Sequence, residues 1–530
     1  MARPGKTATS VGLSSRDDGD GGEGMRRLLT AVLAALALGS GAAMAGPLVH
    51  TATGDVEGVA RSAGVEAFLG VPFAAPPVGD LRWRPPAPAP AWTGARPAKA
   101  FSKDCIQEPQ AYPPGPGFNN PTSEDCLYLN VWRPAGARPG ARLPVMVWIY
   151  GGAFIMGAGS FPNYDGSAFA HDGVVLVTFN YRLGRFGTFA HPALSREQAG
   201  APLANYGLMD QIAALLWVKR NIAAFGGDPG RVTVFGESAG ASSVNFLMGS
   251  PLSRGLFQRA ISESGGSSAS LTPLAAAEAA GAAWAHKQGA DDLATLRALP
   301  ADKVWDGPVT TTMAPVLDGQ VLTRSTDQAF AQGLAASVPY LEGFNSQEES
   351  LLRWLPGSDE RWLARLGERG ERLLALYQAQ GWDRATALKR LWGEAAMAAP
   401  SRARARAVAA HGGRAFLYRY AYLPEASQGR ATGAGHDAEI EMVFENPDVR
   451  WPAAWSARDR RTAAIIHRYW VNFARTGDPN GPGLPRWPAY DPKADRLMQF
   501  GEAGSAVATG HFAGARLDAI DAATVDSPTR

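Results

Sequence analysis

Continuous apolar runs recur along the chain beyond residue 144, and helical periodicity separates several of them. A short run of β-favouring apolar residues is typical of a strand buried on both faces of a parallel sheet. The segment 206–225 instead places apolar residues at the 3.6-residue period of a helix. Alternating strands and helices predict an α/β fold with a doubly wound, mostly parallel sheet. The runs predict strands at residues 145–150, 174–179, 232–235, 259–262, 338–344, 415–422 and 497–500.

The pattern differs before residue 145 and within two later segments. Residues 51–59 predict a hairpin with Gly54 and Asp55 at its turn, and further strands are expected at 65–71 and 127–132. Residues 274–299 and 360–410 are rich in Ala and Leu and predict helices outside the alternating pattern. We therefore expect one catalytic domain at 46–530, with helical insertions at about 267–335 and 350–410 that cover one end of the sheet.

The N-terminus has the pattern of an export signal. Residues 25–27 are Met-Arg-Arg, residues 28–38 are an apolar run too short to span a bilayer, and residues 43–45 form an A-x-A cleavage site. Residues 1–24 fit no export signal. We expect translation to begin at Met25, the mature chain to start near Gly46, and the protein to be exported, to periplasm or medium, with no membrane span.

Composition narrows the class of protein without naming a function. The chain has 530 residues, of which 46% are hydrophobic and 19% charged, and its formal net charge is +2. These values are typical of a globular chain, and they give no reason to expect a nucleic-acid partner. The two cysteines, Cys105 and Cys126, do not have metal-site spacing. In an exported protein a disulfide between them is expected, and closing that loop would contribute about 3 kcal/mol.

One pentapeptide carries the strongest chemical signal. Residues 236–240 read Gly-Glu-Ser-Ala-Gly, directly after the predicted strand 232–235 and before a run that can start a helix. A G-x-S-x-G sequence on a strand-to-helix turn lifts the serine clear of the sheet, where a histidine can reach it. Ser238 is thus a candidate nucleophile, and the N–H of Ala239 is placed to bind a developing oxyanion.

The remaining parts of such a site are expected elsewhere along the chain. The Gly-rich turn after strand 145–150 offers the N–H groups of Gly152 and Ala153 as further oxyanion donors. His436 lies in a loop, whereas His286, His411, His467 and His511 fit helical, capping or surface positions better. The acid should follow strand 338–344, where Glu348 and Glu349 compete. Asp318 and Asp327 are further candidates, and the residues alone do not separate them.

Taken together, these stretches resemble the type-B carboxylesterase family, the α/β hydrolases that include carboxylesterases and cholinesterases. The resemblance runs from about Val59 to the C-terminus, in the family's order. The matching stretches are residues 68–79, 123–132, 148–154, 225–229, 235–241, 472–480 and 487–490. The loop between the cysteines carries no Trp, whereas cholinesterases bind choline with one there. The chain is therefore more similar to a general carboxylesterase.

The resemblance implies roles for single residues. Ser238 would be the nucleophile and His436 the base, and the family's acid falls on Glu348. In this sequence Gln347 and Glu349 stand where the family usually has Asp and Gly.

The resemblance further implies that the N–H groups of Gly152, Ala153 and Ala239 form the oxyanion hole. It also implies a Cys105–Cys126 disulfide and an Arg82–Glu124 ion pair that serves the architecture.

These roles predict hydrolysis of small-molecule carboxylic esters through an acyl-enzyme, with no metal or cofactor. An amidase, or a hydrolase of one large natural ester, would share the same triad. A non-catalytic adhesion or binding module on this fold would lack the serine or the histidine, and this chain has both. The sequence does not indicate the physiological ester or the oligomeric state.

Overall fold

The computed structural model describes residue 12 and residues 46–61, 64–107, 117–266, 271–305, 314–446, 449 and 455–525. The expected export signal at 25–45 lies outside the described residues. The chain divides into the unit 1–46 and the unit from Pro47 onward, and the second contains all the elements below.

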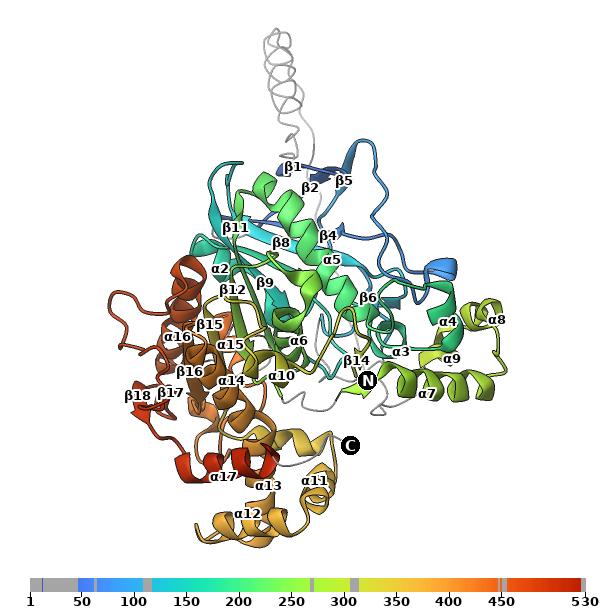
Figure 1. Ribbon diagram of the computed structural model, residues 1–530. Coiled ribbons are helices and arrows are strands. Elements are labelled where there is room, and N and C mark those ends of the chain that lie inside the picture. The colour runs from blue at the N-terminus through green and yellow to red at the C-terminus, as the bar shows by residue number, and fades with distance from the viewer. Residues whose placement is uncertain are drawn as a thin grey trace. The chain divides into compact units, whose positions relative to one another are not determined.

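Eleven strands of the described residues form one sheet, in the order β18-β17-β16-β15-β12-β11-β9-β10-β8-β4-β3 (Figure 1). The seven neighbours from β10 to β17 pair in parallel, and both edges of the sheet are antiparallel. The bounds are β3 (Val59–Arg61), β4 (Val65–Pro72), β8 (Tyr128–Pro134), β9 (Leu143–Ile149), β10 (Val175–Phe179), β11 (Gly227–Glu237), β12 (Arg259–Glu263), β15 (Tyr340–Asn345), β16 (Ala415–Tyr420), β17 (Arg496–Phe500) and β18 (Ala506–Gly510).

Three small sheets lie outside the large one. They are β1 (Leu48–Thr51) with β2 (Gly54–Glu57) and β5 (Ala95–Pro97), β6 (Asp104–Cys105) with β7 (Thr122–Ser123), and β13 (Thr272–Pro273) with β14 (Val316–Leu317). The predicted hairpin exists as β1 and β2, but its turn was placed wrongly. Gly54 pairs with Thr51 at the start of β2, so the turn consists of Ala52 and Thr53. The hydroxyl of Thr51 donates to the carbonyl of Gly54 and closes that turn.

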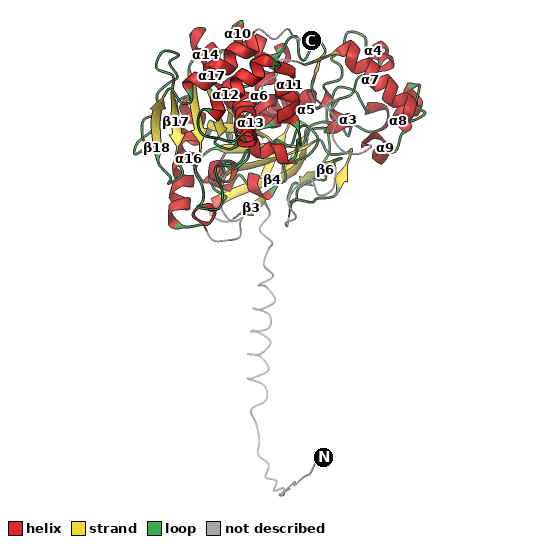
Figure 2. Cartoon of the chain, turned by 90° about the horizontal axis from the view of Figure 1, so that it is seen from below, coloured by secondary structure: helices red, strands yellow, loops and turns green. Residues whose placement is uncertain are grey.

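Helices flank the sheet, which confirms the α/β hydrolase fold class (Figures 1 and 2). Their bounds are α2 (Ser167–His171), α3 (Gly184–Gly187), α4 (Pro192–Glu197), α5 (Tyr206–Asn221), α6 (Ala239–Gly249), α7 (Leu274–Lys287), α8 (Leu293–Ala298), α9 (Ala301–Trp305), α10 (Thr326–Ala331), α11 (Ser358–Leu366), α12 (Glu368–Gln378), α13 (Arg384–Gly393), α14 (Ala399–Ala410), α15 (Ile440–Val443), α16 (Ala457–Thr476) and α17 (Gly514–Val525). Short 3₁₀ turns are η2 (Gly79–Leu81), η3 (Pro162–Tyr164), η4 (Ile222–Phe225), η5 (Pro251–Ser253), η7 (Glu348–Arg353) and η9 (Glu425–Ser427), and η8 (Glu394–Ala398) is a π-helical turn.

The core of the sheet is aromatic on the face covered by α2, α15 and α16. Trp148 of β9 and Phe235 of β11 contact each other, and Phe444 after α15 packs against both. Phe169 of α2 contacts Phe235 and Phe444 in edge-on geometry. Edge-on pairs of this kind stabilise a core beyond the area that they bury. This packing holds β9 and β11 side by side, and the site is built at the carboxyl ends of these two strands.

The helices at residues 274–331 and 358–398 lie beyond the alternating part of the fold. In Figure 1, α7, α8 and α9 lie together on one side of the molecule, and α11, α12 and α13 lie together on another. Bonds from Arg82 tie the first group down, because its guanidinium donates to the carbonyls of Arg297 (3.0 Å) and Leu299 (2.6 Å). The same guanidinium pairs with both oxygens of Glu124.

Candidate active site

Ser238 lies on a sharp turn between β11 and α6. Its backbone angles, φ 57° and ψ −121°, are unusual for a residue with a side chain. Gly240 makes the turn possible, because a Cβ there would overlap the carbonyl oxygen of Ile149 in β9. The N–H of Ser238 donates to the carbonyl of Glu263 (2.8 Å), which fixes the turn to β12. The turn therefore presents the hydroxyl at the carboxyl end of the sheet.

The imidazole of His436 connects Ser238 to Glu348. His436 Nε2 lies 2.7 Å from Ser238 Oγ, and His436 Nδ1 lies 2.5 Å from Glu348 Oε2. A carboxylate only accepts, so Nδ1 carries the proton toward Glu348 and Nε2 accepts from the serine hydroxyl. His436 is 7% exposed and Glu348 is 2% exposed, so both interactions are largely shielded from water.

Two donors hold the other oxygen of Glu348. Ser264 Oγ donates to Glu348 Oε1 at 2.7 Å, and the backbone N–H of Asn345 donates to the same oxygen at 2.6 Å. Both bonds hold the carboxylate in one orientation toward His436. Ser264 was not predicted from the sequence. The feature that could have indicated Ser264 is its position directly after β12, the strand between β11 and β15.

The loop that carries His436 is fastened to the loop that carries Glu348. The amide of Asn345 donates to the carbonyls of Gly435 (2.7 Å) and His436 (2.8 Å), and the N–H of His436 donates to Ser350 Oγ (2.9 Å). Gln347 pairs with Gly435 as an isolated parallel bridge. These bonds fix the backbone of His436 relative to Glu348. Asn345, Gln347 and Ser350, which form them, are not members of the triad.

The two competing glutamates lie in different surroundings. Glu348 faces His436, whereas Glu349 lies against Gly393 at the end of α13, where a Cβ on Gly393 would come 3.1 Å from Glu349 Oε2. Burial raises the pKa of Glu349 despite the nearby charge of Arg390. The geometry therefore brings Glu348, and not Glu349, to the histidine.

Three backbone N–H groups lie near the serine without protein acceptors. They belong to Gly152, Ala153 and Ala239, and none of them donates a hydrogen bond within the described part of the chain. Gly152 and Ala153 both have positive φ, 100° and 54°. Gly151 adjoins Ser238 closely, since a Cβ on Gly151 would lie 3.0 Å from the Ser238 Cβ. Unused N–H groups beside a nucleophile are what an oxyanion requires.

Both helical insertions reach this site. The carbonyl of Phe154, at the end of the glycine turn, accepts from the N–H of Gly184 (2.7 Å), and Gly184 packs against Trp305 of α9. On the other side, Met397 of the π-helical turn η8 adjoins Gly266, which follows β12. The insertions therefore support the segments on which the site is built.

Carboxyl groups surround the site beneath the serine. Glu237 Oε1 lies 3.3 Å from His436 Nε2, and burial, assisted by the charges of Glu439 and Asp437, raises the pKa of Glu237 well above its usual value. Burial also raises the pKa of Glu263 to about 8. The neutral forms are thus favoured, which avoids several adjacent negative charges in a dry interior.

The other sequence predictions have different outcomes. The predicted disulfide is confirmed, with Cys105 and Cys126 joined and their Cα atoms 5.0 Å apart. His467 is buried in α16 and bonds the carbonyl of Val443, and His411 caps α14. Across the described ranges, no group of three or more His, Cys, Asp or Glu is arranged to hold a metal ion. Nor does any helix there combine the length and apolar character that a membrane crossing needs.

Comparisons with known proteins agree with this geometry. The profile of the carboxylesterase family matches residues 45–362 and 371–515. A fumonisin B1 esterase of Sphingopyxis macrogoltabida is 39% identical over 482 residues, which are 85% of this chain and 86% of that protein. Carboxylesterase 1E of Mus musculus is 36% identical over 540 residues, covering 89% of this chain and 93% of the relative.

Solved structures give the same result. A PNB esterase matches with a TM-score of 0.78 and 32% identity, over 89% of this chain and 99% of that one. The carboxylesterase EST55 of Geobacillus stearothermophilus matches with a TM-score of 0.76 and 35% identity, over the same shares of the two chains.

Proposed function

Since this chain belongs to the carboxylesterase family and is a serine carboxylesterase, we propose that its chemistry runs through Ser238, His436 and Glu348. The observation that carries the proposal is the unbroken chain from Ser238 Oγ to His436 (2.7 Å) and from His436 to Glu348 (2.5 Å). That arrangement suits a nucleophile, a general base and an acid that orients the base.

The reaction proceeds in two acyl-transfer steps. Ser238 Oγ attacks the ester carbonyl while His436 Nε2 takes its proton, and Glu348 stabilises the charged imidazolium. The imidazolium returns the proton to the leaving alcohol, and an acyl-serine remains. Water then attacks the acyl group, with His436 again as base, and the acid is released. The steps need no metal or cofactor.

The negative charge of each tetrahedral intermediate requires donors at the carbonyl oxygen. We assign this role to the N–H groups of Gly152, Ala153 and Ala239, which have no protein acceptor among the described residues. Such a donor is typically worth about 3 kcal/mol in the transition state. Ala153 supplies a backbone N–H as a glycine would, so its methyl group does not remove a donor.

Replacement of the serine tests the assignment. Ser238→Ala should lower the kcat for p-nitrophenyl acetate by about 10⁴-fold or more, because the acyl-enzyme can no longer form. Ser242→Ala, one turn along α6, is the matched control and should retain activity with an unchanged melting temperature. A Ser238→Ala protein that is folded and still turns over the ester at the normal rate would remove the serine from the mechanism.

The relatives suggest which esters to compare. One of them is a fumonisin B1 esterase at 39% identity, and we propose a large natural ester of that kind as a substrate in addition to simple esters. Release of acid from fumonisin B1, measured by mass spectrometry beside a graded series of p-nitrophenyl esters, tests this. An enzyme that hydrolyses the aryl esters but leaves fumonisin B1 intact would contradict it. Anilide analogues in the same assay test the amidase alternative.

We also propose that the protein is exported, with cleavage near Ala45. The Cys105–Cys126 disulfide fits an oxidising compartment. Cleavage there would spare the fold, because β1 begins at Leu48 and the carbonyl of Pro47 already accepts from Gly58 N–H (2.8 Å). The intact mass of protein recovered from the periplasm or medium should correspond to a chain starting at Gly46. A mature protein that retains residues 25–45 would refute the cleavage.

A further inference from the structure

A cavity of about 310 Å³ adjoins the loop that carries Glu348 and Glu349. Its walls also include α13, the π-helical turn η8, the end of β16 and the start of α17. The volume lies at the lower end of the range for small-molecule sites. π-Helical turns are rare and occur frequently at functional sites. Glu348 of the proposed triad lines one side of the cavity, but no step of the ester hydrolysis derived above places a substrate group in it.

Three arginines line the cavity, and of these Arg516 alone has an ion pair among the described residues. Arg516 forms two bonds to Glu394, at 3.1 and 2.7 Å, and Glu394 also accepts from the hydroxyl of Tyr377. For Arg390 and Arg419, no hydrogen bond or ion pair of the guanidinium is found in the described ranges. Arg390 Nε is buried without a partner. Two positive charges in the cavity are therefore not neutralised by a direct partner.

Aromatic rings support these two guanidiniums. The Arg390 guanidinium carbon lies 4.8 Å from the ring centre of Trp382, and that of Arg419 lies 4.7 Å from the ring centre of Phe512. Burial lowers the pKa of Arg419, although the negative charges of Glu394 and Glu502 act in the opposite direction. The rings hold the two cations in place.

Three carboxyl groups also line the cavity: Glu394 pairs with Arg516, Glu348 faces His436, and burial raises the pKa of Glu349. The guanidiniums of Arg390 and Arg419 are therefore left to bind an anion.

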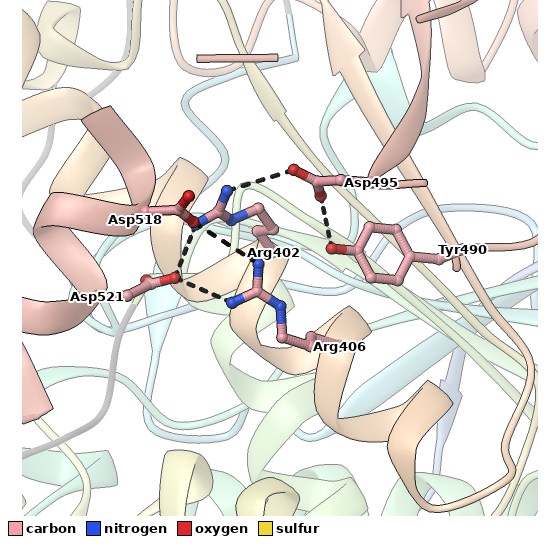
Figure 3. A network of polar contacts seen from close by, with 6 residues as sticks. All are labelled: Arg402, Arg406, Tyr490, Asp495, Asp518 and Asp521. Atoms are coloured by element: carbon pink, nitrogen blue, oxygen red, sulfur yellow. Dashed lines mark hydrogen bonds and ion pairs between the residues drawn. The ribbon is translucent and has the colours of Figure 1, made fainter. Parts of the chain in front are cut away.

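Helix α17 forms part of the cavity wall, and side chains of α14 hold this helix in place. Figure 3 shows Arg402 and Arg406 of α14 directed at Asp518 and Asp521 of α17. Arg402 also contacts Asp495 (3.4 Å). Arg402 is only 2% exposed, and a buried network of this kind holds a helix in one position. Since Arg516 belongs to α17, the cavity has a stable wall.

We propose that this cavity binds a small organic carboxylate, with Arg390 and Arg419 holding the carboxylate and Trp382 and Phe512 contacting its apolar part. A planar guanidinium donates two parallel N–H groups and matches the two oxygens of a carboxylate. An inorganic anion would use the charges but would make no apolar contact with the two rings. Acids released by ester hydrolysis at Ser238 and acids from the surroundings present the same carboxylate chemistry to this cavity.

The probe for the experiment is 4-iodobenzoate, added to the full-length enzyme. We expect crystals soaked with it to show the anomalous signal of iodine in the cavity, and calorimetry to show binding in solution. Arg419→Gln should weaken binding at least tenfold, and Arg390→Gln should do the same. The matched control, Arg365→Gln on the exposed side of α11, should leave binding unchanged. None of these ligands is an ester, so the result does not depend on the triad.

Two further ligands separate charge from shape, and each outcome is decisive. 4-Iodobenzamide has the same ring without the charge and should not bind. Acetate has the charge without the ring and should bind at least tenfold more weakly. The proposal is overturned if the amide binds equally well, if acetate binds as tightly as 4-iodobenzoate, or if iodine is found only outside the cavity. If Arg419→Gln does not fold, two other variants decide the question. They are Arg390→Gln and Arg419→Lys. The lysine keeps the charge, so Arg419→Lys should bind 4-iodobenzoate more tightly than Arg390→Gln does.

Discussion

At the scale of single residues, the two neighbouring glutamates after β15 show how surroundings decide chemistry. Glu348 and Glu349 have the same side chain, and one peptide bond separates them. Glu348 accepts from Ser264 and from the Asn345 N–H, and these donors orient it toward His436. Glu349 is buried toward α13, and burial raises its pKa. Only the first is suited to stabilise an imidazolium.

This difference makes a paired prediction. Glu348→Gln should lower kcat/KM for an aryl ester by about 10³–10⁴-fold, because an amide neither fixes the required tautomer of His436 nor stabilises its charge. Glu349→Gln should change kcat/KM by less than about threefold. Steady-state kinetics of both variants, with circular dichroism to verify folding, measure the effect. Equal losses in the two variants would contradict the assignment of Glu348.

The sequence could predict a serine and a histidine that the fold brings together, but not the whole network around them. Gly-x-Ser-x-Gly is a local pattern, and the loop around His436 is equally local. The residues alone left Glu348 and Glu349 open, and only the family resemblance favoured Glu348. The choice depends on the direction in which each side chain leaves the 3₁₀ turn η7, which composition and periodicity do not determine. Ser264 and Asn345 act through contacts between segments that are distant along the chain, so they become visible only in three dimensions.

At the scale of elements, the strand–turn–helix unit of β11 and α6 determines where the serine lies. The helix starts directly after Ser238, and its first turn packs against the end of β9. Gly240 has no Cβ at the point where the carbonyl of Ile149 passes. Gly240 does not have a positive φ, so its own backbone angles do not require a glycine. The close approach of the β9 backbone requires it.

Gly240→Ala should therefore destabilise the protein strongly. The added methyl group overlaps backbone atoms, which cannot move like a flexible side chain, and we expect a loss of about 3 kcal/mol or more. Gly510→Ala in the edge strand β18 is the matched control, since its Cβ would approach atoms no closer than 3.4 Å. Urea unfolding monitored by tryptophan fluorescence measures both. A Gly240→Ala protein as stable as the control would contradict the packing argument.

The elements predicted best from sequence are those buried on both faces. Most of the parallel strands contain apolar runs, and each was predicted to within a few residues, apart from the early part of β11. The edge strand β18 was missed, because its exposed residues Ala506–Gly510 lack such a run. The helix α17 and the π-helical turn η8 were missed as well. The latter differs from an α-helix only by a local change of hydrogen bonding, which apolar periodicity does not reveal.

At the scale of the whole molecule, the fold carries a group of buried acids around the site. Glu237, Glu263 and Glu439 are each at most 3% exposed, and burial raises the pKa of all three. Glu263 accepts from the indole N–H of Trp470 (2.7 Å), but its second oxygen has no partner. Because these groups keep their protons in the folded state longer than in the unfolded chain, they link stability to pH.

Glu263 offers the clearest test of that link. Its pKa is about 8 when folded, against an ordinary value of 4.5. Between these values the folded state binds more protons than the unfolded state, so the free energy of unfolding falls as the pH rises. The stability that the raised pKa provides is fully present below about pH 4.5 and is lost by about pH 8. Glutamine cannot ionise, and its oxygen can still accept from Trp470.

Glu263→Gln should therefore flatten the pH dependence of stability. Relative to the native protein, the variant should gain about 2–5 kcal/mol between pH 5 and pH 8, since each pKa unit corresponds to about 1.4 kcal/mol. Urea unfolding midpoints at pH 5, 6, 7 and 8 measure the gain. The change of the midpoint with pH is compared between variant and native protein, because a packing cost that is the same at every pH does not affect that change. The midpoints of Glu360→Gln, on the exposed side of α11, should change with pH as those of the native protein do. If the Glu263→Gln midpoints also run parallel, the buried carboxyl does not control the alkaline loss of stability.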